Sequence, residues 1–493
     1  MEHSNDSGHE AADAGDEARV GHALPSRKRV VASAGWYVAS SFLVKALGYI
    51  TIPIFTRIMT QGEFGAFNAF AAMQVLLVAI LGLEAFQTLN RARFDFKDEE
   101  IPIYQFTLTT VTVVFGGGLL GLLLIFPGVF EGIADLDFQY LVIMALYAMF
   151  FPAFNMFQAY QRIQYKYKLS AGIAISVSLF ATALSVLLVV SMSDALMGRI
   201  VGQYVPFVVV GVIAYVAYGL TAKRLGWKYL RYALALCGPL IVATLGTQGM
   251  VLGGRIVVQQ VGPLEEVAYI ALGTSIANIA LVLVTALNNA WAPYLMDCLQ
   301  SDDIDSAHLI LRPFIYFVTS LIVAVSLLAP EVVLILGGWD YMPTVAVVPS
   351  LMLSALFSML AVQFVFVQTY FKKVRAGGVL VFVAACVNAI AGVPAVSMWG
   401  FVAVGYVGLG AYLLLLIGQW LITRSFAPRV MPVRLLGPPI AVAGLLIPVE
   451  LALYGDGLQW LRYLLVAGTC GVALLFIARV WKTRRTSVHT TKA

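Results

Sequence analysis

Three ionisable residues lie inside long apolar stretches of the sequence: Lys45, Glu84 and Glu450. A charge at the centre of a bilayer costs at least about 2.5–3.5 kcal/mol, so such residues usually face water, a charged partner or a ligand. We expect the Lys45 ammonium either to face an aqueous cavity, where it could hold a phosphate, or to form a buried pair with Glu84. Glu84, near the end of its stretch, could also be solvated, cap a helix or take up protons. Glu450 is expected at the membrane interface.

Two arginines, Arg57 and Arg255, each close an apolar stretch and precede a similar acidic and aromatic segment. That segment is 63–67 after the first arginine and 265–269 after the second. Because six predicted helices lie between the copies, the match predicts a parallel repeat of two six-helix lobes. Each guanidinium could guide an anionic group outward, or it could reach the phosphates of the outer lipid leaflet.

Membrane-spanning helices must position these side chains. Hydrophobic residues make up 60% of the chain and charged residues 12%, about half the charged fraction of a typical soluble domain. A bilayer core about 30 Å thick requires about 20 apolar residues per helix. The sequence therefore predicts an all-α polytopic membrane protein with about fourteen spans. We place them at 35–56, 66–86, 104–126, 137–157, 169–191, 198–220, 232–252, 267–290, 313–331, 342–369, 377–397, 400–422, 435–453 and 460–480.

The basic residues are distributed unevenly among the predicted loops. Nearly all of them fall in alternate loops, and only Arg57, Arg199, Arg255 and Arg462 fall in the others. Because basic residues collect on the cytoplasmic side of membrane proteins, this pattern predicts that both termini are cytoplasmic. The topology also explains the formal net charge of +5, so we expect no nucleic-acid partner.

Arg91, Arg162 and Lys166 lie in two of the predicted cytoplasmic loops. They could form an entrance that captures an anionic substrate, although topology alone also explains their positions. In a later loop, Ser301 precedes two acidic residues. This pattern predicts the start of a short cytoplasmic helix that carries His308.

The helix pattern divides the chain into five segments. Residues 1–29 are polar and are expected to form a disordered cytoplasmic tail. Residues 30–225 should form the N-terminal lobe with helices 1–6, and 226–425 the C-terminal lobe with helices 7–12. Residues 426–482 would add helices 13 and 14, and 483–493 would be a second cytoplasmic tail.

The sequence offers few residues suited to catalysis. It contains no His/Cys cluster with metal-ligand spacing, no Walker loop and no nucleotide-binding fingerprint. The four cysteines fall in predicted spans or in a cytoplasmic loop, where a disulfide framework is not expected. We therefore expect a protein that is not an enzyme, with no catalytic residue, no metal, no cofactor and no nucleotide.

Several short segments resemble the polysaccharide transporter family, the oligosaccharide flippases of the multidrug/oligosaccharidyl-lipid/polysaccharide exporter superfamily. In the first half these segments are 40–48, 53–57 and 62–67, and in the second half they are 253–255, 267–269 and 290–293. The resemblance extends over nearly the whole chain, because length, span number and the two-lobe repeat also agree. It implies two six-helix bundles around a central cavity that opens alternately to the two sides of the membrane.

The resemblance also implies a substrate, an undecaprenyl-diphosphate-linked oligosaccharide repeat unit for O-antigen (lipopolysaccharide), capsule or exopolysaccharide biosynthesis. The protein would lie in the bacterial cytoplasmic (inner) membrane, in contact with membrane lipids and with a polysaccharide polymerase and chain-length machinery. Lys45, Arg57, Arg255 and Glu84 are the candidate substrate-binding residues. Related peptidoglycan-precursor flippases are expected to carry several cavity arginines, whereas Lys45 is here the only cation deep in a predicted span.

Two alternatives remain open from the sequence. The first is a cation-coupled multidrug or metabolite exporter of the same superfamily, for which acids deep in the first lobe would be expected and only Glu84 is available. The second is a membrane enzyme that acts on lipid-linked sugars. Such an enzyme would be expected to carry a large periplasmic loop with catalytic residues, and the sequence predicts no loop of that size.

Overall fold

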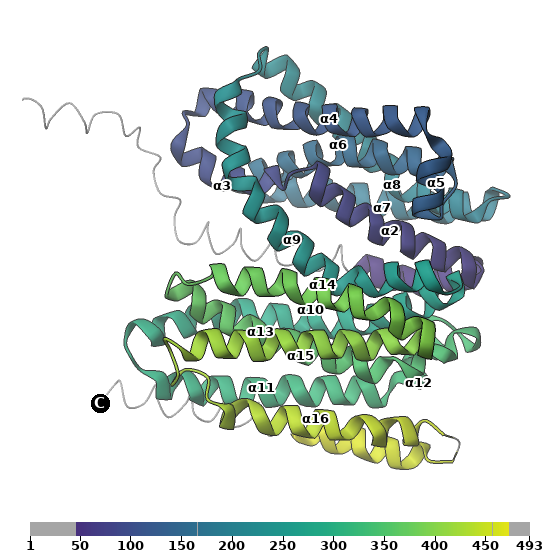
Figure 1. The fold of residues 1–493 in the computed structure, drawn as a ribbon, viewed down its shortest axis with the longest axis vertical. Helices are drawn as coiled ribbons and strands as arrows, with labels where there is room; N and C mark the ends of the chain where they lie inside the picture. The colour runs from purple at the N-terminus through teal and green to yellow at the C-terminus, as the bar shows by residue number, and fades with distance from the viewer. Residues whose placement is uncertain (1–45, 165, 456, 473–493) are drawn as a thin grey trace, which may run out of the picture.

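A computed structural model describes residues 46–164, 166–455 and 457–472, and within these ranges the protein is built from helices without strands (Figure 1). The first part contains helix 46–58 (Ala46–Ile58), α2 (Gln61–Leu81), α3 (Ala85–Asp95), η1 (Asp98–Glu100), α4 (Ile101–Ile125), α5 (Pro127–Ala134), α6 (Phe138–Ile163), α7 (Tyr167–Ser191) and α8 (Ala195–Ala222). The second part contains α9 (Trp227–Val261), α10 (Leu264–Gln300), α11 (Ile304–Leu327), α12 (Ala329–Leu336), η2 (Trp339–Ala346), α13 (Val348–Tyr370), α14 (Arg375–Trp399), α15 (Val402–Arg424), α16 (Val433–Leu453) and helix 459–472.

Twelve helices of the described part are long and apolar enough to cross a membrane. They coincide with the second to the thirteenth predicted spans, so the prediction of a polytopic all-α membrane protein is confirmed. The first and the fourteenth predicted spans each extend outside the described residues. The total of fourteen therefore stays a prediction.

The second predicted span is wrong at its end. We placed it at 66–86, but α2 ends at Leu81 and a separate helix, α3, begins at Ala85. Between them, Leu83 and Glu84 have φ angles of 54° and 50°, in the left-handed region that side chains disfavour. Glu84 consequently stands at a break between two helices and not inside a span.

The short cytoplasmic helix predicted after Ser301 is also wrong. His308 lies in the first part of the spanning helix α11, which begins at Ile304. The Asp303 carboxylate, not the Ser301 hydroxyl, caps this helix by accepting a hydrogen bond from the backbone N–H of Ser306 at 3.0 Å. The hydrogen bonds from Ser306 lower the pKa of Asp303, whereas Ser301 donates back to the Asp297 carbonyl in α10 at 2.9 Å.

The helices form two groups, with α9 between them (Figure 1). The first group contains α2 to α8, in which α8 packs against α6 and α7, and α4 packs against α6. The second group contains α10 to α16, in which α13 packs against α10, α11 and α15. Helix α9 packs along α14 of the second group and also contacts α2 and α4 of the first.

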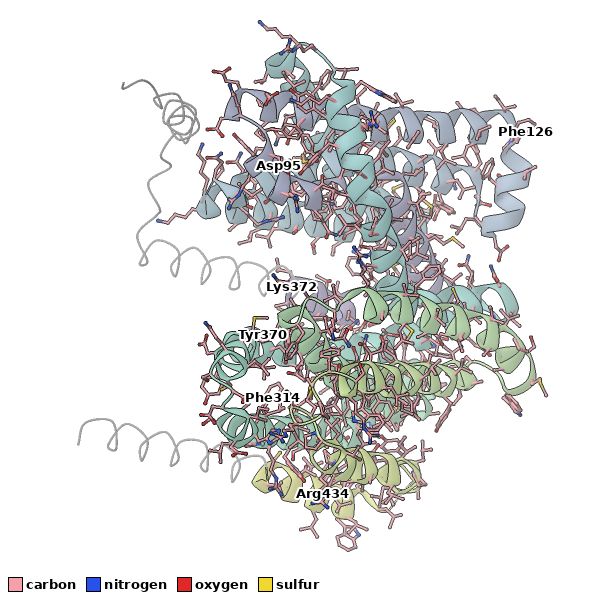
Figure 2. All side chains as sticks on the ribbon, turned by 60° about the vertical axis from the view of Figure 1, so that its left-hand side comes forward. Asp95, Phe126, Phe314, Tyr370, Lys372 and Arg434 are labelled. Carbon is pink, nitrogen blue, oxygen red and sulfur yellow. The ribbon has the colours of Figure 1, made fainter. Side chains whose placement is uncertain are left out.

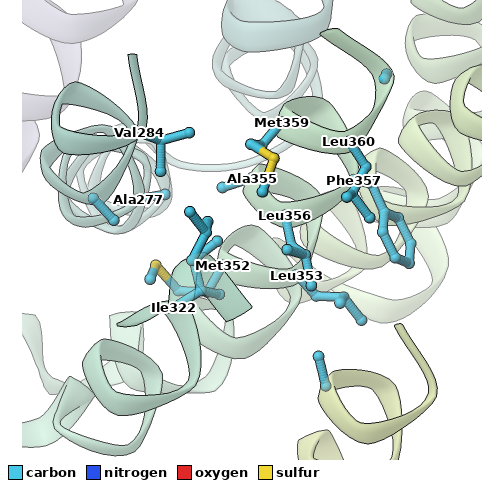
Figure 3. Close-up of a cluster of buried hydrophobic side chains, with 14 of the residues drawn as sticks. Ala277, Val284, Ile322, Met352, Leu353, Ala355, Leu356, Phe357, Met359 and Leu360 are labelled. Atoms are coloured by element: carbon cyan, nitrogen blue, oxygen red, sulfur yellow. The ribbon is translucent and has the colours of Figure 1, made fainter. Parts of the chain in front are cut away.

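Apolar side chains fill the second group. Helix α13 contributes Met352, Leu356 and Leu360 to a cluster of buried side chains that also contains Ile322 of α11 and Val284 of α10 (Figure 3). Leu356 and Leu360 have no exposed surface. Such close packing is the ordinary condition of a protein interior, and it leaves little room for a ligand.

The last two helices are tied to the second group by polar contacts. Arg462 of helix 459–472 forms an ion pair with Glu331 of α12. Glu450 of α16 is 3% exposed, and its carboxylate accepts a hydrogen bond from the Ser326 hydroxyl of α11 at 2.6 Å. Glu450 is thus buried against α11, and its predicted position at the membrane interface stays a prediction.

Helices α5 and α3 lie on opposite sides of the molecule, here called the α5 side and the α3 side (Figure 1). Helix 46–58 and the start of α2 join the two groups on the α5 side. Thr56 donates to the Leu336 carbonyl at 2.6 Å, and Gln61 donates to the Asp340 carbonyl at 2.6 Å. A Cβ atom on Gly65 would lie 1.8 Å from the Leu264 carbonyl oxygen, so only glycine allows α2 to approach α10 this closely. These contacts close the α5 side between the two groups.

Candidate functional site: a polar cavity beside helix α9

A cavity of about 750 Å³ lies among the helices of the first group and α9. Helix 46–58, α2, α3, α6, α7, α8 and α9 each contribute side chains to its wall. The lining includes the charged residues Arg199 and Glu84, and otherwise consists of aromatic, amide, hydroxyl and aliphatic side chains. This volume lies within the range of about 300–1,000 Å³ that small-molecule sites usually occupy.

Arg199 of α8 is the most unusual group of this cavity. The residue is 9% exposed, and its Nε and Nη1 atoms have no hydrogen-bond partner among the described residues. Its Cζ atom lies 3.3 Å from the centre of the Phe55 ring and 4.5 Å from the centre of the Phe67 ring. Ring faces attract a cation, but they do not satisfy N–H donors, so two nitrogen atoms of this guanidinium are left without a hydrogen bond.

The local packing of α8 explains where Arg199 lies. The Asp194 carboxylate caps the helix by accepting from the Met197 N–H at 2.9 Å. Gly198 and Gly202 flank the arginine, and a Cβ atom on Gly202 would lie 2.3 Å from the Cα atom of Ser185 in α7. Because these glycines bring α8 close to α7, the guanidinium is held toward α2 and helix 46–58, where its ring partners lie.

The two arginines singled out in the sequence lie outside the cavity lining. Arg255 lies within α9, which continues past the predicted end of its span, and is 9% exposed. It donates to the Asn68 side chain at 3.4 Å, so the suggested reach to lipid phosphates is wrong for this residue. Arg57 is exposed and donates to the Pro53 and Ile335 carbonyls at 2.8 and 3.1 Å.

Glu84 lines the cavity at the break between α2 and α3. It is 9% exposed, and its carboxylate accepts a hydrogen bond from Gln87 at 2.5 Å. Burial raises the pKa of Glu84, and the bond from Gln87 offsets part of this shift. A carboxyl group in this setting keeps its proton to a higher pH than an exposed one.

Among the remaining predicted residues, Arg91, Arg162 and Lys166 are described by the structure and do not line the cavity. Lys45 lies outside the described residues, so its predicted contact with phosphate or with Glu84 stays a prediction. Arg91 is exposed and pairs with Asp95 at 3.4 Å, and Lys166 is exposed while Arg162 is half-buried on the same α3 side. Figure 2 shows Asp95 on the first group and Lys372 on the second at that side of the molecule.

Sequence reasoning missed the aromatic wall of the cavity. Tyr147 and Phe151 of α6 lie one helical turn apart and stack with their ring centres 4.4 Å apart. Tyr204 of α8 meets Tyr147 edge-on at 4.8 Å, and Phe207 meets Phe151 edge-on at 5.9 Å. All four residues line the cavity. The spacing of these aromatics on one face of each helix was a visible signal, although membrane helices often use the same spacing for plain packing.

Amide and hydroxyl side chains line the same cavity. The amides are Gln74, Gln87, Asn155, Gln203 and Gln248, and the hydroxyls are Thr51, Ser178, Thr182, Thr244 and Thr247. Gln74 is 1% exposed and donates to the Met144 carbonyl at 3.2 Å, while its Oε1 atom has no partner within the described ranges. These side chains can both donate and accept hydrogen bonds, and they lie among the apolar surfaces that form most of the wall.

An all-helical chain with two groups of apolar helices and a polar cavity beside α9 has the build of a multi-pass membrane transporter. Among solved structures, it is similar to the one titled "Lipid II flippase MurJ, inward closed conformation", with a TM-score of 0.66 and 12% identity, covering 91% of this chain and 99% of that chain. It is also similar to a multidrug resistance MATE family transporter of the MOP superfamily in an inward-facing conformation, with a TM-score of 0.54 and 13% identity over 78% of this chain and 99% of that chain. At these identities the likeness shows the fold.

A third solved structure of this fold is a MOP superfamily transporter from Pyrococcus furiosus, with a TM-score of 0.52, 13% identity and coverage of 86% of this chain and 96% of that chain. No curated protein matches the chain in sequence. Residues 30–299 match the family model described as "Polysaccharide biosynthesis protein". The chain belongs to this polysaccharide biosynthesis family and has the fold of MOP superfamily transporters.

Proposed function

We propose that this protein is a flippase for undecaprenyl-diphosphate-linked oligosaccharide repeat units, which it moves across the bacterial cytoplasmic membrane for the synthesis of a surface polysaccharide. Family membership and the likeness to a lipid II flippase support the general class. The observation that carries the proposal is Arg199, a buried cation with free N–H donors on the wall of a large polar cavity. A diphosphate is the anionic group that would satisfy those donors.

The proposed mechanism needs little chemistry beyond charge and shape. The diphosphate would bind beside Arg199, where low polarity strengthens its attraction to the guanidinium. Hydrogen bonds at the α5 side join helix 46–58 to α12 and α2 to η2. Breaking these bonds would let the two groups separate and open the cavity on the α5 side. The lipid chain would stay in the bilayer, because it is already surrounded by apolar lipid chains there and moving it into the cavity would gain little.

The orientation belongs to the same proposal. The α3 side, which carries the exposed Arg91 and Lys166, would face the cytoplasm, with both termini on that side. The α5 side would face the periplasm, where a polysaccharide polymerase and chain-length machinery would receive the repeat units. Lys45, Arg57 and Arg255 remain candidate contacts for the substrate, with Lys45 nearest in sequence to cavity residues Leu47 and Gly48.

Lipid analysis of a strain lacking the gene tests the proposal. The strain should accumulate lipid-linked repeat units on the cytoplasmic face and lose a surface polysaccharide. Complementation with the wild-type chain and with the control variant Arg231→Ala, at an exposed position of α9, should restore both. An unchanged polysaccharide profile with no accumulated lipid-linked sugar would contradict the proposal.

Glu84 favours one alternative, a cation-coupled exporter of small molecules. Its carboxyl group lines the cavity, and burial raises its pKa, as proton coupling would require. This function predicts altered susceptibility to toxic compounds in the deletion strain, together with an intact surface polysaccharide.

A further inference from the structure

We infer that the wall formed by Tyr147, Phe151, Tyr204 and Phe207, here called the aromatic wall, binds the sugar next to the diphosphate, and that this sugar carries no charge. The inference rests on the proposed function and assigns a separate part of the cavity to the glycan. Arg199 would hold the diphosphate, and the aromatic wall with its neighbouring amides would hold the sugar ring.

A continuous series of ring contacts leads from Arg199 into the cavity. The guanidinium lies over Phe67 at 4.5 Å, and the Phe67 ring centre lies 6.3 Å from that of Tyr204. Tyr204 in turn meets Tyr147, which stacks on Phe151 with an angle of 17° between the rings. A diphosphate at Arg199 would therefore place the first attached sugar beside these rings.

The cavity distinguishes this wall from ordinary aromatic packing. Phe154 of α6 belongs to the same cluster, with its ring centre 6.1 Å from Phe151 and 5.8 Å from Phe207, but it does not line the cavity. Phe151 and Phe207 do line it and remain partly exposed. Aromatic surface that stays partly open beside polar groups is characteristic of a site for a ligand with mixed polarity.

The polar groups beside the rings match the rest of a sugar. A pyranose ring has faces of C–H groups, which pack on aromatic rings, and a rim of hydroxyl groups, which both donate and accept hydrogen bonds. Asn155 and Gln203 also line the cavity, each with an amide that can do both. The unpartnered Oε1 atom of Gln74 is a further acceptor. A purely apolar drug would leave these amides unsatisfied.

The charges of the cavity indicate that the sugar is neutral. Among the described lining residues, Arg199 is the positive group, and the proposed function uses it for the diphosphate. Glu84 is the negative group and lies in the same cavity. A uronic acid in this cavity would find no second cation among the described lining residues, and the Glu84 carboxylate would repel it.

Binding to the purified full-length chain tests the inference with two probes. One probe is undecaprenyl diphosphate without sugar, and the other is the lipid-linked repeat unit extracted from the deletion strain, both measured by native mass spectrometry. Phe151→Leu keeps an apolar side chain but removes the ring face. It should weaken binding of the sugar-bearing probe by about five- to tenfold and change binding of undecaprenyl diphosphate less than about twofold. Phe151→Tyr, which keeps a ring, should restore binding.

The matched control is Phe154→Leu, which should affect both probes equally. Equal effects of Phe151→Leu on both probes would overturn the aromatic-wall assignment and leave the proposed function standing, provided that Arg199→Gln weakens both. Failure of the wild-type chain to bind either probe would overturn the proposed function itself. A repeat unit whose first sugar is a uronic acid would overturn the assignment of a neutral sugar.

Discussion

The first group of helices surrounds, together with α9, a polar cavity of about 750 Å³, whereas a pocket among α9, α10, α13, α14 and α15 has only about 70 Å³. Both groups are built from helices of similar length and composition. In the second group, residues such as Met352 and Leu356 fill the interior (Figure 3). In the first group, the corresponding interior carries Arg199, Glu84 and a row of amides. The first group thus encloses space that could hold a ligand, whereas apolar side chains fill the interior of the second group.

Changing the packed group should have the largest effect on stability. Leu356 has no exposed surface and lies at the centre of the second group. Leu356→Ala should lower the free energy of unfolding by about 2–5 kcal/mol, because the lost methyl groups leave a cavity. The change should appear as a lower melting temperature in detergent, while transport per folded molecule at low temperature stays near wild type. A stable Leu356→Ala protein that cannot transport would contradict the claim that the second group serves packing and not ligand binding.

A matched pair of amides sharpens the comparison further. Gln419 is buried in the second group, accepts from Gln368 at 2.6 Å and donates to the Gly377 carbonyl at 3.2 Å. Gln419→Leu should cost about 1–3 kcal/mol of stability, because buried partners lose their bonds. Gln203→Leu, in the cavity wall, should leave the melting temperature within about 1–2 °C of wild type and reduce export of the polysaccharide.

Melting curves and polysaccharide yield, measured on both variants, check this pair. If Gln203→Leu destabilised the protein as much as Gln419→Leu and left export unchanged, the cavity amides would be structural.

The smallest expected effect concerns Glu84 and pH. Because burial raises its pKa above the ordinary value of 4.5, the folded chain holds this proton to higher pH than the unfolded chain. The ionised carboxylate therefore penalises the folded state at neutral pH, and this penalty is lost as the pH falls toward 4.5. Glu84→Gln should raise the melting temperature by about 1–2 °C at pH 7, and the gain should vanish near pH 4.5. A melting temperature lowered equally at all pH values would contradict this account.

The sequence predicted the helices well because length and apolar composition alone define a span. It found twelve of them, with an error at the end of the second predicted span, and it separated α14 from α15, between which only residues 400 and 401 lie. The break between α2 and α3 could not be predicted, since Leu83 and Glu84 adopt left-handed conformations that their residue types disfavour.

The candidate site was predicted only in part. Glu84 was found because a carboxylate in an apolar stretch is conspicuous. Arg199 was assigned to a loop beside the membrane, because it lies at the first residues of its predicted span, where an arginine is ordinary. Its burial depends on Phe55 and Phe67, which are distant in sequence and reach it only through the packing of helix 46–58 and α2 against α8. A pattern of neighbouring residues in the sequence cannot predict a contact between residues so far apart in the chain.

Arg199 offers the most direct test of the claim that the cavity of the first group is the transport path. The measurement is the amount of lipid-linked repeat unit on the cytoplasmic face, together with surface polysaccharide, in the deletion strain carrying Arg199→Gln. Loss of a buried cation that binds an anion costs about 2–5 kcal/mol, so export should fall at least about 30-fold with normal protein levels. Arg231→Ala is the control. Full export by a normally expressed Arg199→Gln variant would contradict the account.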